Sequence, residues 1–217
     1  MKILASIFAP LFLSLALALL TLGNPARPIT DLAARSTRTF PANCRWTSAP
    51  CLIIGPSVDE GFAALAAKTW DRFLTAFSPL APCIGDVHLR ASYRLPARAG
   101  YDPASATVTV RVPGSAAKLR AALIHEWAHH IEFQCPQQRL MRPAFLAAEG
   151  FAPDTPWRPH DAQVLADTWA NIPSEHFAEA AIELVLGHNP TPTQIHVTQE
   201  GLKALAAWLS GGEAGEE

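Results

Sequence analysis

The chain has 217 residues, of which 49% are hydrophobic and 17% are charged, and its formal net charge is −2. This length is typical of one domain, and this composition is that of a globular protein rather than a disordered one. Because the chain has no basic cluster, the charge pattern gives no reason to expect a nucleic acid as a partner.

The N-terminus has the pattern of a secretory signal. A single lysine precedes a largely apolar run over residues 3–23, and small or turn-forming residues follow it. We predict a signal peptide over residues 1–26, cleaved after Gly23 or Ala26. The alternative is an uncleaved membrane anchor formed by residues 3–23, since about 20 apolar residues can cross a bilayer as a helix. Both alternatives predict a secreted or extracytoplasmic domain, and only the second predicts contact with a membrane.

The chain has four cysteines, Cys44, Cys51, Cys83 and Cys135. An even number behind a secretory signal predicts two disulfides, and of the three possible pairings we favour Cys44–Cys51 with Cys83–Cys135. The second bond would close a loop of about 50 residues, worth roughly 4 kcal/mol of stability. Zinc bound by cysteines is the less favoured alternative, because no Cys-x-x-Cys pair is present.

A linker is predicted over residues 27–43 and a disordered tail over residues 211–217, and the chain between them alternates strand and helix patterns. We predict strands over residues 51–54, 87–92 and 106–112, and helices over residues 59–77, 116–133, 174–186 and 198–210. Ser57, Ser115 and Thr198 are the predicted N-caps.

Prolines concentrate in residues 136–173, which we expect to form loops with a short helix near Phe145–Glu149. A few strands beside one long helix, followed by a mainly helical half, indicate the α+β class. We therefore predict a single domain over residues 44–210, with a small β-sheet beside the helix of residues 116–133.

That long helix contains the motif H-E-x-x-H at His125, Glu126 and His129. Residues four apart lie on one helix face, so the two imidazoles can bind one zinc ion. Glu126 is rotated to the side, where it can act as general base toward water activated by the metal. Apolar neighbours indicate that the helix is buried, where such polar groups cost free energy unless they are paired or bind a metal. The alternative is a polar helix face satisfied by neighbouring side chains.

Two further polar residues of this helix receive other interpretations. His130 points away from the face shared by His125 and His129, and we interpret it as structural. Glu132 could support the site or form a surface ion pair, and the surface pair is favoured.

A catalytic zinc site usually has three protein ligands and one open position. Two glutamates are candidates for the third ligand: Glu175, at the start of the helix of residues 174–186, and Glu149, which precedes a glycine. If Glu175 binds the metal, Glu179 lies one turn further on and can orient the ligands by hydrogen bonding. The alternative is that Glu175, Glu179 and Glu183 form a solvated helix face, with neither candidate bound to a metal.

The segments HEWAHH (residues 125–130) and EHFAEA (residues 175–180) together resemble the gluzincin metallopeptidases, and in particular the anthrax lethal factor-like family. The resemblance implies a zincin-like fold, Zn²⁺ as cofactor, Glu175 as third ligand and Glu179 behind it. The segment that begins at Glu149 is similar instead to the ligand segment of thermolysin-like aminopeptidases.

One feature of the lethal factor-like family is missing. That family has a tyrosine shortly before its glutamate ligand, which is thought to steady the oxyanion, whereas this chain has Thr168-Trp169 in that neighbourhood. The tyrosines of this chain are Tyr93 and Tyr101. The sequence therefore does not identify the group that would stabilise an oxyanion.

Together these features predict a secreted zinc-dependent metallopeptidase that hydrolyses peptide or amide bonds of a protein or peptide substrate. The first alternative is a catalytically degenerate, zincin-like secreted binding protein, which the missing tyrosine favours. The second is a structural domain that binds no metal.

Overall fold

The computed structural model describes residues 50–159 and 166–211. The predicted signal peptide or anchor, the predicted linker and nearly all of the predicted tail lie outside these residues, as does Cys44 of the predicted Cys44–Cys51 pair. Among the described helices, none has the length and hydropathy needed to cross a membrane.

The described chain is α+β, as predicted. Its strands are β1 (Leu52–Ile54), β2 (Val87–Ser92), β3 (Ala99–Asp102) and β4 (Thr107–Arg111). Its helices are α1 (Glu60–Ala76), α2 (Ala81–Ile84), α3 (Ala116–Gln134), α4 (Gln138–Ala148), α5 (Ala166–Trp169), α6 (Pro173–Leu186) and α7 (Gln199–Leu209), with a 3-10 turn at Ser78–Leu80.

The four strands form one mixed sheet in the order β1-β2-β4-β3. The strands β1, β2 and β4 are parallel, and β3 pairs antiparallel with β4 at the edge. Along β2 the side chains of Val87 and Leu89 are buried while those of His88 and Arg90 are exposed. This alternation shows that one face of the sheet packs on the core and the other faces solvent.

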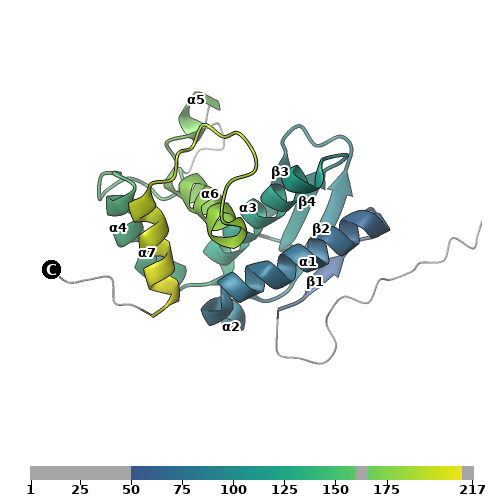
Figure 1. Cartoon of the computed structure of the whole chain (residues 1–217), viewed down its shortest axis with the longest axis horizontal. Helices are drawn as coiled ribbons and strands as arrows, with labels where there is room; N and C mark the ends of the chain where they lie inside the picture. Colours follow the sequence, from purple (N-terminus) through teal and green to yellow (C-terminus); the bar gives the residue numbers. More distant parts are fainter. Residues whose placement is uncertain (1–49, 160–165, 212–217) are drawn as a thin grey trace, which may run out of the picture. The chain divides into compact units, whose positions relative to one another are not determined.

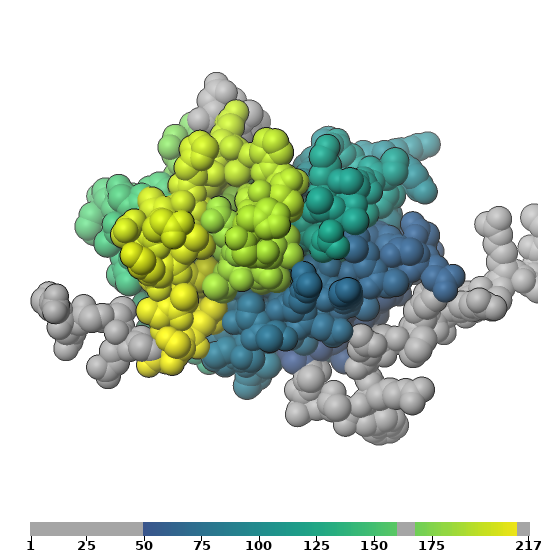
Figure 2. Space-filling view, viewed as in Figure 1, coloured from purple at the N-terminus to yellow at the C-terminus, as the bar shows by residue number. Residues whose placement is uncertain are grey.

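The helix α3 lies between the sheet and the C-terminal helices (Figure 1). It contacts β3, β4, α1 and α6, and α7 packs against α6 and α4. In the space-filling view, the green surface of α6 adjoins the blue surface of α1 (Figure 2). All residues from Ala121 to Ile131 in α3 are buried, so the H-E-x-x-H motif lies in the interior.

Aromatic side chains fill the contact between α1 and α3. The ring centroid of Trp127 lies 4.8 Å from that of Trp70 and 5.4 Å from that of Phe73, and Phe77 packs on Phe73 at 4.7 Å. Full burial of each such side chain contributes about 1.5–3 kcal/mol. This cluster fixes the side of α3 that lies opposite His125 and His129.

The predicted cap of the first helix is wrong. The N-cap of α1 is Asp59, whose carboxylate accepts a hydrogen bond from the backbone N–H of Phe62. The hydroxyl of Ser57 instead accepts a hydrogen bond from the backbone N–H of Ala91 in β2. Ser57 therefore joins the turn between β1 and α1 to β2, while Ser115 and Thr198 cap α3 and α7 as predicted.

The helix α4 is longer than the sequence predicts. A short helix is expected near Phe145–Glu149, but the observed helix spans Gln138–Ala148 and contains Pro143. Proline removes one backbone hydrogen bond inside a helix. Burial of Met141, Phe145 and Leu146 on one face offsets that loss, because tertiary packing contributes more to helix stability than propensity does.

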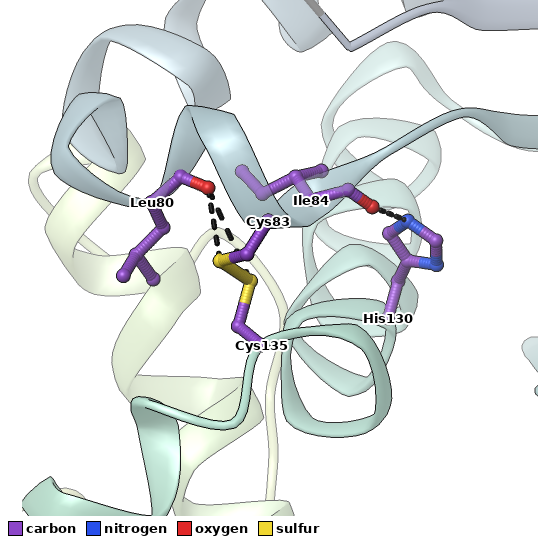
Figure 3. The surroundings of a disulfide bond; sticks show 5 residues. All are labelled: Leu80, Cys83, Ile84, His130 and Cys135. Atoms are coloured by element: carbon purple, nitrogen blue, oxygen red, sulfur yellow. Dashed lines mark hydrogen bonds between the residues drawn. A yellow bond between two sulfur atoms is a disulfide. The ribbon is translucent and has the colours of Figure 1, made fainter.

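The predicted Cys83–Cys135 disulfide is confirmed, and it joins residues 52 positions apart (Figure 3). It connects α2 to Cys135, the residue at which α3 ends. A second link lies beside it, where Nε2 of His130 is 2.7 Å from the backbone oxygen of Ile84. The C-terminal half of α3 is thus attached to α2 at two points.

Candidate metal centre

Three side chains meet where α3 packs against α6. His125 and His129 extend from α3, and Glu175 extends from the first turn of α6. The two Nε2 atoms are 3.2 Å apart, and the Glu175 carboxylate lies 3.1 Å from Nε2 of His125 and 3.5 Å from Nε2 of His129. These ligand atoms all lie within 4.8 Å of one another, and all three residues are buried.

The start of α6 explains the position of Glu175. Pro173 occupies the first helical position, where its missing N–H costs nothing and its fixed φ suits the helix. A carboxylate in the first turn is favoured by the helix dipole. Residue Glu179, one turn further on, places a second carboxylate on the same face of α6.

A carboxylate holds the far nitrogen of each imidazole. Nδ1 of His125 lies 3.0 Å from Glu179, and Nδ1 of His129 lies 3.3 Å from Glu132. Because a carboxylate only accepts hydrogen bonds, we assign a proton to Nδ1 of His125, which leaves its Nε2 for a metal. Metal-binding histidines in proteins are usually oriented in this way. Nδ1 of His129 lies beside both the Glu132 carboxylate, which accepts, and Nη2 of Arg158, which donates, so its contacts are compatible with either tautomer.

The expectation that Glu132 forms a surface ion pair is wrong. Its side chain is only 6% exposed and contacts both His129 and Arg158. Arg158 donates from Nε to one carboxylate oxygen at 3.1 Å and from Nη2 to the other at 2.9 Å. The same Nη2 lies 2.9 Å from Nδ1 of His129.

Glu179 has a matching arginine on the other side of the centre. Arg98 donates from Nη2 to Glu179 at 3.2 Å, and Asn189 donates to the second oxygen of that carboxylate. Each imidazole is therefore backed by a carboxylate, and each carboxylate by an arginine. Neither arginine has a sequence signal that points to the site.

The charges of the centre are strongly coupled. Burial lowers the pKa of His125, but hydrogen bonds to Glu175 and Glu179 outweigh it and raise that pKa to about 10. Burial raises the pKa of Glu175, but hydrogen bonds to His125 and His129 outweigh it and hold that pKa well below its usual range. The carboxylates thus stay ionised and favour positive charge between them.

A cavity of about 420 Å³ opens onto the three ligand candidates, within the size range of ligand sites. Glu126 lines it and makes no hydrogen bond or ion pair to any described residue. The ring of Trp169 also lines it and lies nearly parallel to that of His125, with centroids 6.2 Å apart. Residues of the edge strand β3 form another wall.

Glu149 is not part of this group. Its fully buried side chain accepts hydrogen bonds from the backbone N–H and hydroxyl of Thr198, both at 3.0 Å. It also lies 2.9 Å from Nδ1 of His176. Glu149 therefore joins the end of α4 to the start of α7 and to α6, a structural role that its sequence context did not indicate.

Tyr101, a residue of the unpredicted strand β3, lines the cavity, but its hydroxyl is already used. Nε2 of His130 faces the carbonyl of Ile84, so this nitrogen carries the proton and Nδ1 accepts from the Tyr101 hydroxyl at 2.8 Å. Burial lowers the pKa of His130 to about 4, which keeps the ring neutral. These contacts agree with the structural interpretation of His130.

No protein family model matches the chain, and comparison with curated proteins and with solved structures found no match either. The chemistry of the described side chains is therefore the basis for a functional proposal.

Proposed function

We propose that the protein is a zinc-dependent metallohydrolase, and specifically a peptidase of the gluzincin type that its two motifs resemble. The observation that carries this proposal is the buried convergence of His125, His129 and Glu175 beside the unpaired carboxylate of Glu126. A buried group of this kind is costly unless a cation or a set of protons holds it together.

The residues present fit a zinc ion. Two imidazoles and one carboxylate are the ligands of many catalytic zinc sites, and that set leaves one coordination position open. The carboxylates of Glu179 and Glu132 hold Nδ1 of the two rings, so both Nε2 atoms are directed inward. The donor set of two nitrogens and one oxygen suits zinc better than calcium or magnesium.

A zinc ion bound there would supply Lewis acidity, which polarises a carbonyl and makes water a stronger nucleophile near neutral pH. Glu126 would take a proton from the attacking water and pass it to the leaving amine. The low exposure of this part of the cavity strengthens each of these charge interactions.

The edge strand β3 supports a polypeptide as the substrate class. Among the described strands, β3 pairs only with β4, and Ala99, Gly100 and Tyr101 line the cavity. The outer edge of such a strand can pair with an extended peptide through main-chain hydrogen bonds. A peptide added in this way would lie along the cavity that holds Glu126.

Metal content and one substitution test this proposal. We expect about one zinc per chain by elemental analysis. Glu126→Gln keeps the size of the side chain but removes the base, so we expect zinc to remain while hydrolysis of a peptide library falls by roughly 10²–10⁴-fold. Glu60→Gln, at an exposed position of α1, is the matched control.

Each other outcome contradicts part of the proposal. If protein purified without chelators contains no zinc, both the peptidase function and any other zinc-dependent function are ruled out. Loss of zinc from the Glu126→Gln variant would mean that this carboxylate is a ligand rather than the base. Zinc without turnover in the wild type would favour the zincin-like binding protein, which the engagement of the Tyr101 hydroxyl by His130 also favours.

We also propose that the domain functions in a secreted or extracytoplasmic setting. The Cys83–Cys135 disulfide is consistent with an oxidising compartment, where such bonds persist. Mass spectrometry of the non-reduced protein from its native compartment tests this, and free thiols at both positions would contradict it.

A further inference from the structure

The cavity has two arginines, and they differ in how many of their donors are engaged. Arg98 uses both terminal nitrogens, since Nη1 donates to the hydroxyl of Thr191 and Nη2 to Glu179, each at 3.2 Å. Arg158 uses Nε and Nη2 for Glu132. Its Nη1 makes no hydrogen bond within the described part of the chain.

The guanidinium of Arg158 is held in place before any ligand arrives. Its two-point contact with the buried Glu132 fixes its plane. The same group lies over the ring of Phe133, with 5.4 Å between Cζ and the ring centroid. The side chain of Arg158 is nevertheless 37% exposed, so one edge of the guanidinium remains accessible from the cavity.

The charges of the centre would sum to zero once a divalent cation is bound. Four carboxylates surround it, those of Glu126, Glu132, Glu175 and Glu179. The two guanidiniums and a divalent cation would balance these charges. An additional carboxylate beside Arg158 could then accept a hydrogen bond from Nη1 without being repelled by a net negative charge of the centre.

We propose that Arg158 is a substrate-binding residue that recognises a carboxylate close to the scissile bond. This inference rests on the proposed peptidase function and names its substrate class: peptides with an acidic side chain near the cleaved bond or with a nearby C-terminal carboxylate. The guanidinium fork matches a carboxylate, and Phe133, which is 47% exposed, offers an apolar surface beside it.

The test uses binding rather than turnover. The full-length chain carrying Glu126→Gln is loaded with zinc and titrated with fluorescein-labelled hexapeptide pools, and anisotropy gives the dissociation constants. One pair of pools differs only in Glu against Gln at a fixed position. A second pair differs only in a C-terminal acid against an amide. Arg158→Gln and Arg158→Lys are then introduced, with Arg94→Gln at an exposed position as the control.

We expect one of the carboxylate pools to bind roughly 10- to 100-fold more tightly than its uncharged counterpart, as a charge-assisted hydrogen bond predicts. Arg158→Gln would bring this ratio close to one, and Arg94→Gln would leave it unchanged. Arg158→Lys would keep only part of the ratio, because a lysine has no planar fork. The pool that shows the preference distinguishes a side-chain carboxylate from a C-terminal one.

A purely structural role for Arg158 gives a different pattern. If Arg158 only supports Glu132 and His129, its loss would weaken zinc binding and would affect charged and uncharged pools equally, which would overturn the proposal. A missing preference in the parent, or one that survives Arg158→Gln, would also overturn it. If Arg158→Gln fails to fold, Arg158→Lys decides instead: a ratio that falls part of the way supports the proposal, and an unchanged ratio overturns it.

Failure of the proposed function is recognised separately. If zinc-loaded wild type cleaves none of the pools, the peptidase proposal fails, whereas the carboxylate site is judged from the binding ratios alone.

Discussion

At the scale of single residues, the structure separates the two glutamates that compete for the role of third ligand. Glu175 lies against both imidazoles, whereas Glu149 accepts hydrogen bonds from Thr198 and lies beside His176. We expect Glu175→Gln to weaken zinc binding by more than 10-fold, because it removes a charged ligand. Competition with a chromogenic chelator measures this affinity.

The matched variant is Glu149→Gln. It should keep wild-type zinc affinity and lower the free energy of unfolding by about 1–3 kcal/mol, because buried hydrogen bonds at the start of α7 are weakened. Zinc affinity that falls in this variant but survives in Glu175→Gln would reverse the two assignments.

His130 gives the protein a predictable acid sensitivity. Its pKa is about 4 in the folded chain against 6.5 for an ordinary histidine, so the folded state favours the neutral ring. Its contribution to stability is complete above pH 6.5 and is lost as the pH falls toward 4. We expect the free energy of unfolding of metal-free protein to fall by about 2–3 kcal/mol between pH 6.5 and 4.5.

The other histidines with shifted pKa values do not mask this loss, whereas Glu132, Glu175 and Glu179, whose pKa values are lowered, begin to lose their own contributions as the pH approaches 4.5. The pKa values of His125, His129 and His176 are raised, so their stabilising contributions are complete and constant below pH 6.5. Urea unfolding of His130→Gln over the same pH range should show a much flatter dependence, since glutamine does not titrate. His88→Gln, at an exposed position of β2, should keep the wild-type slope.

The sequence predicts those parts of the centre that are brought together within a single helix. His125 and His129 are brought together by helix periodicity alone, and the second motif placed Glu175 and Glu179 one turn apart. The sequence does not predict the positions of Arg98 and Arg158, because both lie in irregular segments, which have no hydrophobic periodicity. The burial of Glu132 depends on Arg158 and was missed for the same reason.

At the scale of elements, α7 begins against Glu149 so closely that only glycine fits at Gly201. A Cβ built there would lie 1.7 Å from a carboxylate oxygen of Glu149 and 2.7 Å from its Cδ. We expect Gly201→Ala to lower the free energy of unfolding by about 1–3 kcal/mol through overpacking. This exceeds the gain of up to about 1 kcal/mol that alanine gives in a helix.

Thermal unfolding with Gly100→Ala as the comparison measures this effect. A Cβ at Gly100 in β3 meets nothing within 4 Å, so this substitution has no comparable steric cost. A Gly201→Ala variant at least as stable as wild type would mean that Glu149 can leave its position at little cost.

The elements with a clear periodicity of apolar residues were predicted well. The helices α1, α3, α6 and α7 and the strands β2 and β4 agree with the sequence to within about two residues, as expected for differences in assigning helix ends. The strand β3 is short, contains Gly100 and depends on pairing with β4, so no local pattern reveals it. The full length of α4 was hidden by Pro143, which usually ends a helix.

At the scale of the whole molecule, the Cys83–Cys135 bond constrains the unfolded chain. It joins residues 52 positions apart, so its loss should cost roughly 4 kcal/mol. For a chain of this size, we expect the Tm of the metal-free double variant Cys83→Ala/Cys135→Ala to fall by about 10 °C. Reduction of wild type with a phosphine should give a similar shift, and an unchanged Tm in both experiments would contradict the prediction.

The placement of the three ligand candidates has a consequence for how the molecule holds together. Two of them belong to α3, which packs on the sheet, and the third belongs to α6, which packs with α7. An ion seated among them would act as a non-covalent cross-link between these two layers. Its removal would then be felt as faster amide hydrogen exchange throughout α6 and α7, well beyond the atoms that touch it.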